Sequence, residues 1–236
     1  MKLIKSQILL LFIFLGLQSN CQILFDASAG INWSFLISSP QYGSGGGSYQ
    51  SYPSNSYSLE VKGRRSKVIH LGFSAIYYLS NFNWLYESEG HYPNGQDALF
   101  KMDWLRISIF PEFSFGKTFQ VFFNISPFIS FLINSSKSGY TTYYQKINNL
   151  EYVKVQTPIY GTANDDFHDL DFGFQSSLGI TYYIVKWFGI TIKESCSLSL
   201  LNANKKYSSN GYVKNASLNI LLGATFLISE KTKKLN

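Results

Sequence analysis

Residues 170–201 read LDFGFQSSLGITYYIVKWFGITIKESCSLSLL, and this stretch decides the fold. On both sides of Val185-Lys186-Trp187, bulky apolar residues alternate with small or polar ones. A period of two places the two sets on opposite faces of a β-strand, so the stretch predicts two antiparallel strands joined by a very short turn. Glu194 falls on the apolar parity, and we expect a bulge or another local departure there.

The two faces of this hairpin favour a barrel in lipid over a soluble sheet. In a soluble sandwich the apolar face points inward and the polar face meets water. Here the strands have roughly ten or more residues, the length of a tilted membrane-crossing strand. The polar face carries small residues and little charge, which suits a crowded barrel interior.

Composition agrees with this reading. Aromatic residues make up 17% of the 236 residues and charged residues only 14%, against about a quarter in soluble domains. Beyond the N-terminus no segment reaches the ~18 consecutive apolar residues of a spanning helix. The net charge of +6 includes the tail lysines, and no basic groove interleaved with aromatics predicts a nucleic-acid partner.

The N-terminus predicts a signal peptide over residues 1–21, followed by one β-barrel domain over 22–236. Lys2 and Lys5 form a basic start and residues 8–17 an apolar core, with small or polar residues before the expected cut. The alternative is a lipoprotein signal with Cys21 lipidated. If Cys21 is removed, Cys196 is the only cysteine and no intramolecular disulfide can form.

Alternation and turn residues predict eight strands. A proline inside the fourth, Pro111, predicts a bulge or kink. The basic run 62–67 is placed at the far end of the first long loop, 37–57, or on the rim of the strand that follows. A small hairpin is expected at 143–155 inside the loop 134–168. The predicted strands cover 23–36, 68–79, 84–92, 99–115, 121–133, 170–184, 188–201 and 216–228.

The lengths of the connections alternate. Tight turns are predicted at 80–83, 116–119 and 185–187, and longer connections elsewhere. Barrels of the bacterial outer membrane have an even strand count, short periplasmic turns and long external loops. The fold class is therefore predicted as all-β, an eight-stranded antiparallel up-and-down transmembrane β-barrel of the bacterial outer membrane with both termini periplasmic.

Four segments carry a family resemblance: FDASAGINWSFL (25–36), LRISIFPEFSFGK (105–117), VFFNISPFISFLI (121–133) and DFGFQSSLGITYYI (171–184). With the leader before them, they resemble the PorT-like outer-membrane β-barrel family of the Bacteroidetes type. The resemblance implies a fold and a location, and it implies no activity. The C-terminal end departs from a typical outer-membrane assembly signal, because Leu221 stands where a polar residue is expected and a tail follows.

The inward parity predicts a polar plug. An eight-stranded barrel closes around an interior that side chains fill, and buried charges there must pair. The alternative is a proton or ion path. The residues predicted to form the plug are Asp26, Glu87, Arg106, Glu112 and Lys193.

One acidic cluster precedes the sixth predicted strand, with Asp165, Asp166, His168 and Asp169 as weak candidates for a cation site. Asp166 and His168 also resemble the Asp/His pair of omptin-type surface proteases, but a second acidic pair is not found, and a solvated loop is the simpler interpretation.

The sequence thus predicts a non-enzymatic outer-membrane protein without a cofactor. It serves as an anchor or as an accessory to an envelope or secretion complex, surrounded by outer-membrane lipid, with loops 37–57 and 134–168 available to protein partners. The alternative is a small outer-membrane enzyme, a surface protease or a lipid-modifying enzyme, with its site at the outer rim.

Overall fold

The computed structural model describes residues 22–38, 48–64, 66, 68–87, 95–148, 151–203 and 213–228, so the predicted signal peptide and Cys21 lie outside the described residues. Within these ranges the chain forms ten β-strands, and no helix is long and apolar enough to span a membrane. The strands are β1 (Gln22–Ser38), β2 (Ser48–Tyr52), β3 (Ser54–Arg64), β4 (Ile69–Glu87), β5 (Gly95–Gly116), β6 (Phe119–Asn148), β7 (Glu151–Gly161), β8 (Leu170–Val185), β9 (Phe188–Ser199) and β10 (Val213–Ile228).

Eight of these strands close a ring in which every neighbour is antiparallel. The order β1-β3-β4-β5-β6-β8-β9-β10 returns to β1, with Ile23 opposite Ile228 in the closing pair. Consecutive strands of the ring are neighbours, and the prediction of an eight-stranded up-and-down barrel is confirmed. The two remaining strands, β2 and β7, lie outside the ring and pair with β4 and β6.

The connections divide the barrel into two ends. At one end, which we call the turn end, the links are 65–68, 117–118 and 186–187, and the first and last described residues, Gln22 and Ile228, lie there too. Gly116 begins one of these turns with φ 104°, and a Cβ at this position would lie 1.9 Å from the carbonyl oxygen of Phe119. Glycine is therefore required for the tight return.

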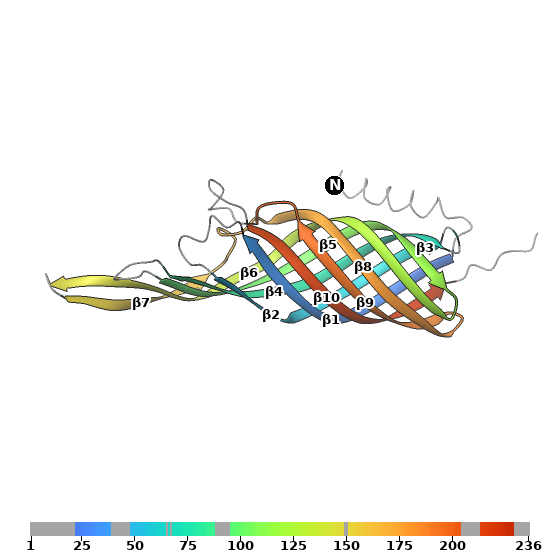
Figure 1. Ribbon diagram of the computed structural model, residues 1–236, viewed down its shortest axis with the longest axis horizontal. Helices are drawn as coiled ribbons and strands as arrows, with labels where there is room; N and C mark the ends of the chain where they lie inside the picture. The colour runs from blue at the N-terminus through green and yellow to red at the C-terminus, as the bar shows by residue number, and fades with distance from the viewer. Residues whose placement is uncertain are drawn as a thin grey trace, which may run out of the picture.

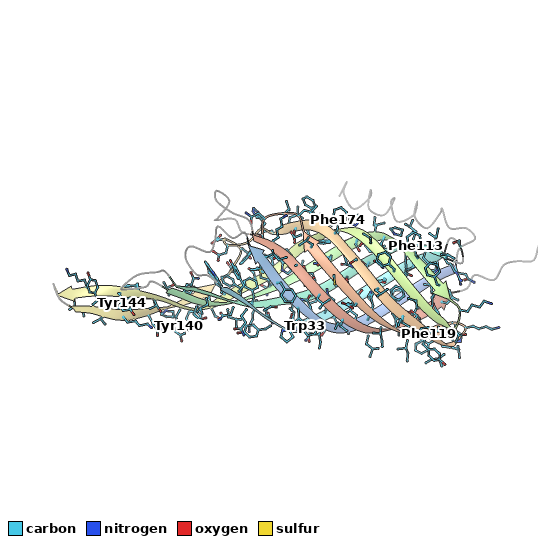
Figure 2. The ribbon with its side chains drawn as sticks, in the orientation of Figure 1. Trp33, Phe113, Phe119, Tyr140, Tyr144 and Phe174 are labelled. Atoms are coloured by element: carbon cyan, nitrogen blue, oxygen red, sulfur yellow. The ribbon has the colours of Figure 1, made fainter. Side chains whose placement is uncertain are left out.

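The opposite end, which we call the arm end, carries the longer links and a projecting sheet. β4, β5 and β6 continue past the ring, β2 adds to β4, and β7 adds to β6 (Figure 1). Beyond the pair Gly95–Thr142, β6 and β7 go on alone as a two-stranded ribbon, which carries the label Tyr144 in Figure 2. We call the ribbon formed by 143–148 and 151–156 the arm.

Three predicted boundaries are wrong. Residues 54–64, assigned to a loop and its basic end, form the barrel strand β3. The turn predicted at 80–83 lies inside the continuous strand β4. Residues 134–142, assigned to a loop, belong to β6, so the predicted hairpin at 143–155 is the outer part of a longer one. The predicted number of eight strands is nevertheless correct, because the prediction omits β3 and divides β4 into two strands.

Of the two irregularities expected within the strands, the bulge at Glu194 is absent, and at Pro111 the ladder between β5 and β6 is interrupted over 109–111 without a register shift. Glu194 pairs in register with Leu178 on one side and Ile220 on the other, so β9 has no bulge there and the side chain faces outward. The pairs Ser108–Phe128 and Glu112–Asn124, on either side of Pro111, keep one register, so this proline causes no register shift. The missing N–H of a proline removes a ladder bond without displacing the strand.

The two faces of the wall exchange character along the same strands. The change falls on the row in which Leu79, Asp103 and Asn134 pair across β4, β5 and β6. On the turn-end side of this row the outward side chains are apolar, and Phe113, Phe119 and Phe174 point away from the wall in Figure 2. On the arm side the outward residues are mainly polar: Asn81, Asn83, Asp97, Lys101 and Ser136.

The inward face changes in the opposite sense. Towards the turn end it carries buried polar and charged side chains, among them Ser74, Ser108 and Glu112. Beyond the row it carries the buried apolar cluster built on Phe82, Ala98, Phe100 and Met102. Each of β4, β5 and β6 therefore passes from apolar outside and polar inside to polar outside and apolar inside.

Candidate functional site

A chain of paired charges fills the interior near the turn end. Lys62 Nζ lies 2.7 Å from Glu112 Oε2 and 3.2 Å from Glu60 Oε2, and the second oxygen of Glu60 accepts a hydrogen bond from Lys193. His70 Nδ1 lies 3.2 Å from Glu112 Oε1. All five side chains are buried. Because opposite charges alternate along the chain, each buried ion has a partner in the low-dielectric interior.

The pairing explains why these strands place such residues inward. β3 presents Glu60 and Lys62, β4 presents His70, β5 presents Glu112 and β9 presents Lys193, all on the inward parity. Lys62 Nζ also lies 4.6 Å from the centroid of the Phe122 ring, a cation–π contact. The network joins four strands across the barrel, so it braces the wall from inside.

Arg106 occupies the middle of the barrel with neutral partners. Its guanidinium donates to Tyr78 Oη at 2.9 Å, to Ser130 Oγ at 3.2 Å and to Gln175 Oε1 at 3.3 Å. It also lies over the rings of Tyr78 and Phe128, at 4.6 Å and 4.2 Å from the centroids. Hydrogen bonds and stacking on two aromatic faces satisfy this planar cation at 2% exposure.

The arm end of the interior is closed by aromatic packing. Phe167, from the segment between β7 and β8, packs edge-on against Phe82 and Phe100, at centroid distances of 5.6 Å and 5.4 Å. Ala163 and Ala203 from two different connections join the same buried cluster. Paired charges towards the turn end and aromatic rings towards the arm end therefore form a plug with two layers inside the barrel.

Four of the five residues predicted for the plug are buried inside the barrel: Asp26, Arg106, Glu112 and Lys193. Asp26 accepts a hydrogen bond from Thr225 Oγ1 at 2.7 Å. The side chain of Glu87 lies outside the described residues. Sequence reasoning missed Glu60 and Lys62, although Ser54, Ser56 and Ser58 continue their parity, because the neighbouring glycine- and serine-rich run resembled a loop.

The four weak cation candidates do not form a cluster. Asp166 Oδ2 accepts a hydrogen bond from Lys137 Nζ at 2.6 Å, whereas Asp165, His168 and Asp169 are exposed. The backbone N–H of His168 donates to the carbonyl of Ala203 at 3.0 Å, which fixes the chain and leaves the imidazole outside. Across the ranges that the structure describes, no group of three or more His, Cys, Asp or Glu side chains is placed to hold a metal ion.

Comparisons with known proteins give distant structural likenesses. No family model matches the chain, and no curated protein matches it. Among solved structures, the outer membrane protein OprG of Pseudomonas aeruginosa is similar with a TM-score of 0.46 and 11% identity, covering 90% of this chain and 99% of that one.

Two further solved structures are similar at the same level. The attachment invasion locus protein Ail of Yersinia pestis has a TM-score of 0.43 and 10% identity, covering 87% of this chain and 98% of that one. The neisserial surface protein A has a TM-score of 0.43 and 12% identity, covering 86% and 96%. These likenesses are too distant to assign a function to this chain.

Proposed function

We propose that this protein is a non-enzymatic barrel of the bacterial outer membrane that holds a rigid external arm above the cell surface for binding. The observation that carries the proposal is the exchange of faces at the Leu79–Asp103–Asn134 row. A barrel in water would keep its apolar residues inside along its whole length. Apolar residues outside up to one row, and inside beyond it, fit a wall that leaves lipid and enters water at that row.

The height of the apolar band supports the same conclusion. On β4 the outward residues are apolar from Ile69 to Leu79. At about 3.3 Å per residue and a tilt of about 40°, this segment spans roughly 25 Å along the barrel axis, the height of the lipid-facing band of outer-membrane barrels. Trp187 at the turn end adds an interfacial aromatic residue.

The turn end is proposed to face the periplasm, since short turns lie on that side of such barrels and the longer connections outside. The chain would then be exported into the periplasm by a signal peptide over residues 1–21, which is removed on export. The PorT-like resemblance agrees with this reading and would place the protein in an envelope of the Bacteroidetes type, as an anchor or an accessory to an envelope or secretion complex.

The two-layer plug argues for binding over transport, because charged pairs and aromatic rings occupy the axis. The arm offers the binding surface. Tyr140, Tyr143, Tyr152 and Tyr160 on and beside it are exposed, and β7 pairs along only one of its edges in the described part of the chain. Exposed aromatic residues on a projecting sheet are typical of contact surfaces.

Surface labelling tests this topology. One epitope tag is inserted between Asn148 and Asn149 at the tip of the arm, and another, in a separate strain, follows Asn236. The arm tag should label on intact cells, and the C-terminal tag only after permeabilisation. Labelling of the C-terminal tag on intact cells, with the arm tag silent, would reverse the proposed orientation.

A second experiment separates the arm from the barrel. Thr142 and Gln156 are paired across β6 and β7, so residues 143–155 can be replaced by Asn-Gly, a two-residue hairpin turn. The shortened protein should reach the outer membrane at normal levels and lose its cellular role in a complementation assay. Full complementation by this variant would show that the arm is dispensable.

A further inference from the structure

The outer face of the barrel carries one carboxylate at the centre of its apolar band. Glu194 is six residues from Phe188 at the turn end of β9 and five from Ser199 at the other end. Its register neighbours are Leu178 and Ile220. Among the outward residues of β8 (172–184), β9 (188–198) and β10 (216–228), Glu194 is the only acidic or basic one.

The Glu194 side chain is exposed, and its carboxylate makes no hydrogen bond or ion pair with the residues that the structure describes. A carboxyl group facing hydrocarbon finds no donor there, and such a group is costly unless it is paired or hydrogen-bonded. Ionisable residues at this depth in membranes therefore usually mark a site with a partner.

A hydrogen-bond donor lies beside it on the same face. Ser176 of β8 is directly opposite Cys196 of β9, and Cys196 is two residues from Glu194 along the strand. Ser176 and Glu194 are thus diagonal neighbours, with Cα atoms about 7–8 Å apart. The three residues Ser176, Glu194 and Cys196, which we call the polar notch, are surrounded by larger apolar side chains, and the small side chains of two of them leave room for close approach.

We propose that the notch is a dimer contact, in which the β8–β9 face of a second copy covers it and Ser176 of each copy donates a hydrogen bond to Glu194 of the other. A two-fold interface uses the same patch on both copies. An axis that passes between Ser176 and Glu194 therefore brings the serine of each copy to the glutamate of the other. A second copy supplies the hydrogen-bond donor that the carboxylate lacks. The donor lies at the correct depth in the bilayer, since both copies span the same membrane.

This inference rests on the proposed function, because the notch needs a partner only if the band faces lipid. Cys196 is close to the proposed axis, is exposed and is a free thiol, so the native protein contains its own probe. Membranes from cells that produce the full chain are treated with a short bis-maleimide, and the products are separated by size. We expect a crosslinked species of twice the chain mass, absent in Cys196→Ser.

Matched variants separate a specific contact from collisions. In the Cys196→Ser background, Ala75→Cys places the thiol on the outward face of β4, across the ring from β9, and it should not crosslink. Glu194→Leu and Ser176→Ala should each lower the crosslinked yield about 30-fold, because a substitution carried by both copies removes both hydrogen bonds of the two-fold contact. Glu194→Gln, which still accepts a hydrogen bond, should retain most of it.

The outcomes are distinct. Equal crosslinking by the Ala75→Cys variant, or an unchanged yield with Glu194→Leu, would overturn the dimer. A Cys196-dependent product of another mass would overturn the second copy as occupant in favour of a different membrane protein. Each sample is also washed with alkaline carbonate. Protein that stays in the membrane without crosslinking overturns only the dimer, whereas protein that washes off overturns the membrane location itself.

Discussion

Replacing Ile180 by arginine tests directly whether the apolar band faces lipid. Ile180 is outward, 41% exposed, and paired with Ile192 of β9 and Val121 of β6, so its whole row is apolar. It is five residues from the end of β8 at Val185. With about 3.3 Å per residue and a tilt of about 40°, its side chain lies roughly 12 Å above the turn end, near the middle of the band.

The expected cost of this substitution in the free energy of unfolding is about 2–4 kcal/mol, the value for a cation at the bilayer midplane. In equilibrium terms the folded population falls roughly 30- to 700-fold relative to the unfolded one. The same change on a barrel surface in water would cost less than about 0.5 kcal/mol, because an exposed arginine is well solvated. The two environments therefore predict results that differ well beyond experimental error.

The measurement is reversible guanidinium unfolding in phospholipid vesicles, followed by tryptophan fluorescence. Ser138→Arg is the matched control, since Ser138 is exposed on β6 beyond the row where the faces exchange. It should change the free energy of unfolding by less than about 0.5 kcal/mol. Equal costs for the two variants, or a stable Ile180→Arg variant, would refute the assignment of the band to lipid.

Three further predictions concern the interior and the rim. Lys62→Met should cost about 3–5 kcal/mol in the same unfolding assay, since it leaves buried carboxylates without their shared cation, and adding Glu112→Gln should restore part of the loss. Phe167→Ala should cost about 3–5 kcal/mol in the same unfolding assay, because it removes the ring that closes the arm end and leaves a cavity against Phe82 and Phe100. Asp166→Ala and His168→Ala should both complement at normal membrane levels, and failure of either would favour the cation-site or protease alternative.

The sequence was sufficient for the part of the barrel in which alternation is strict. In β8 and β9 large apolar and small polar residues alternate almost without exception, and the structure places them outward and inward as predicted. Two of the three predicted tight turns, at 116–119 and 185–187, are also found at the turn end, whereas the third, at 80–83, lies inside β4. Both signals are local, so a single sequence is enough to read them.

Two of the three boundary errors, at 80–83 and at 134–142, have a common physical cause at the row where the faces exchange. Asn81 and Asn83 stand on the parity that carries apolar residues earlier in β4, and this change resembled a turn. It is in fact the same strand continuing with its polar face outward. A prediction that keeps the apolar residues on one face of each strand therefore divides a long strand in two wherever the apolar residues change face.

The charge network could not be found from sequence for a different reason. Lys62 and Glu112 are far apart in the chain and meet only because β3 and β5 flank β4 in the ring. The prediction of a loop around 54–64 also hides Lys62 and Glu60, which are the partners of Glu112 and Lys193. Long-range pairs between strands depend on the whole register, which no local pattern contains.

The continuity of β6 has a mechanical consequence. This strand runs from Phe119 to Asn148 as one element, so the arm and the barrel wall share a backbone. From residue 134 to its tip the strand is roughly 50 Å long at about 3.3 Å per residue. Such a strand acts as a lever that pivots at the barrel wall, and a tilt of about ten degrees would move the tip by roughly 9 Å over that length. A load applied to the tip would reach the wall as a torque, carried by the hydrogen bonds between β5 and β6.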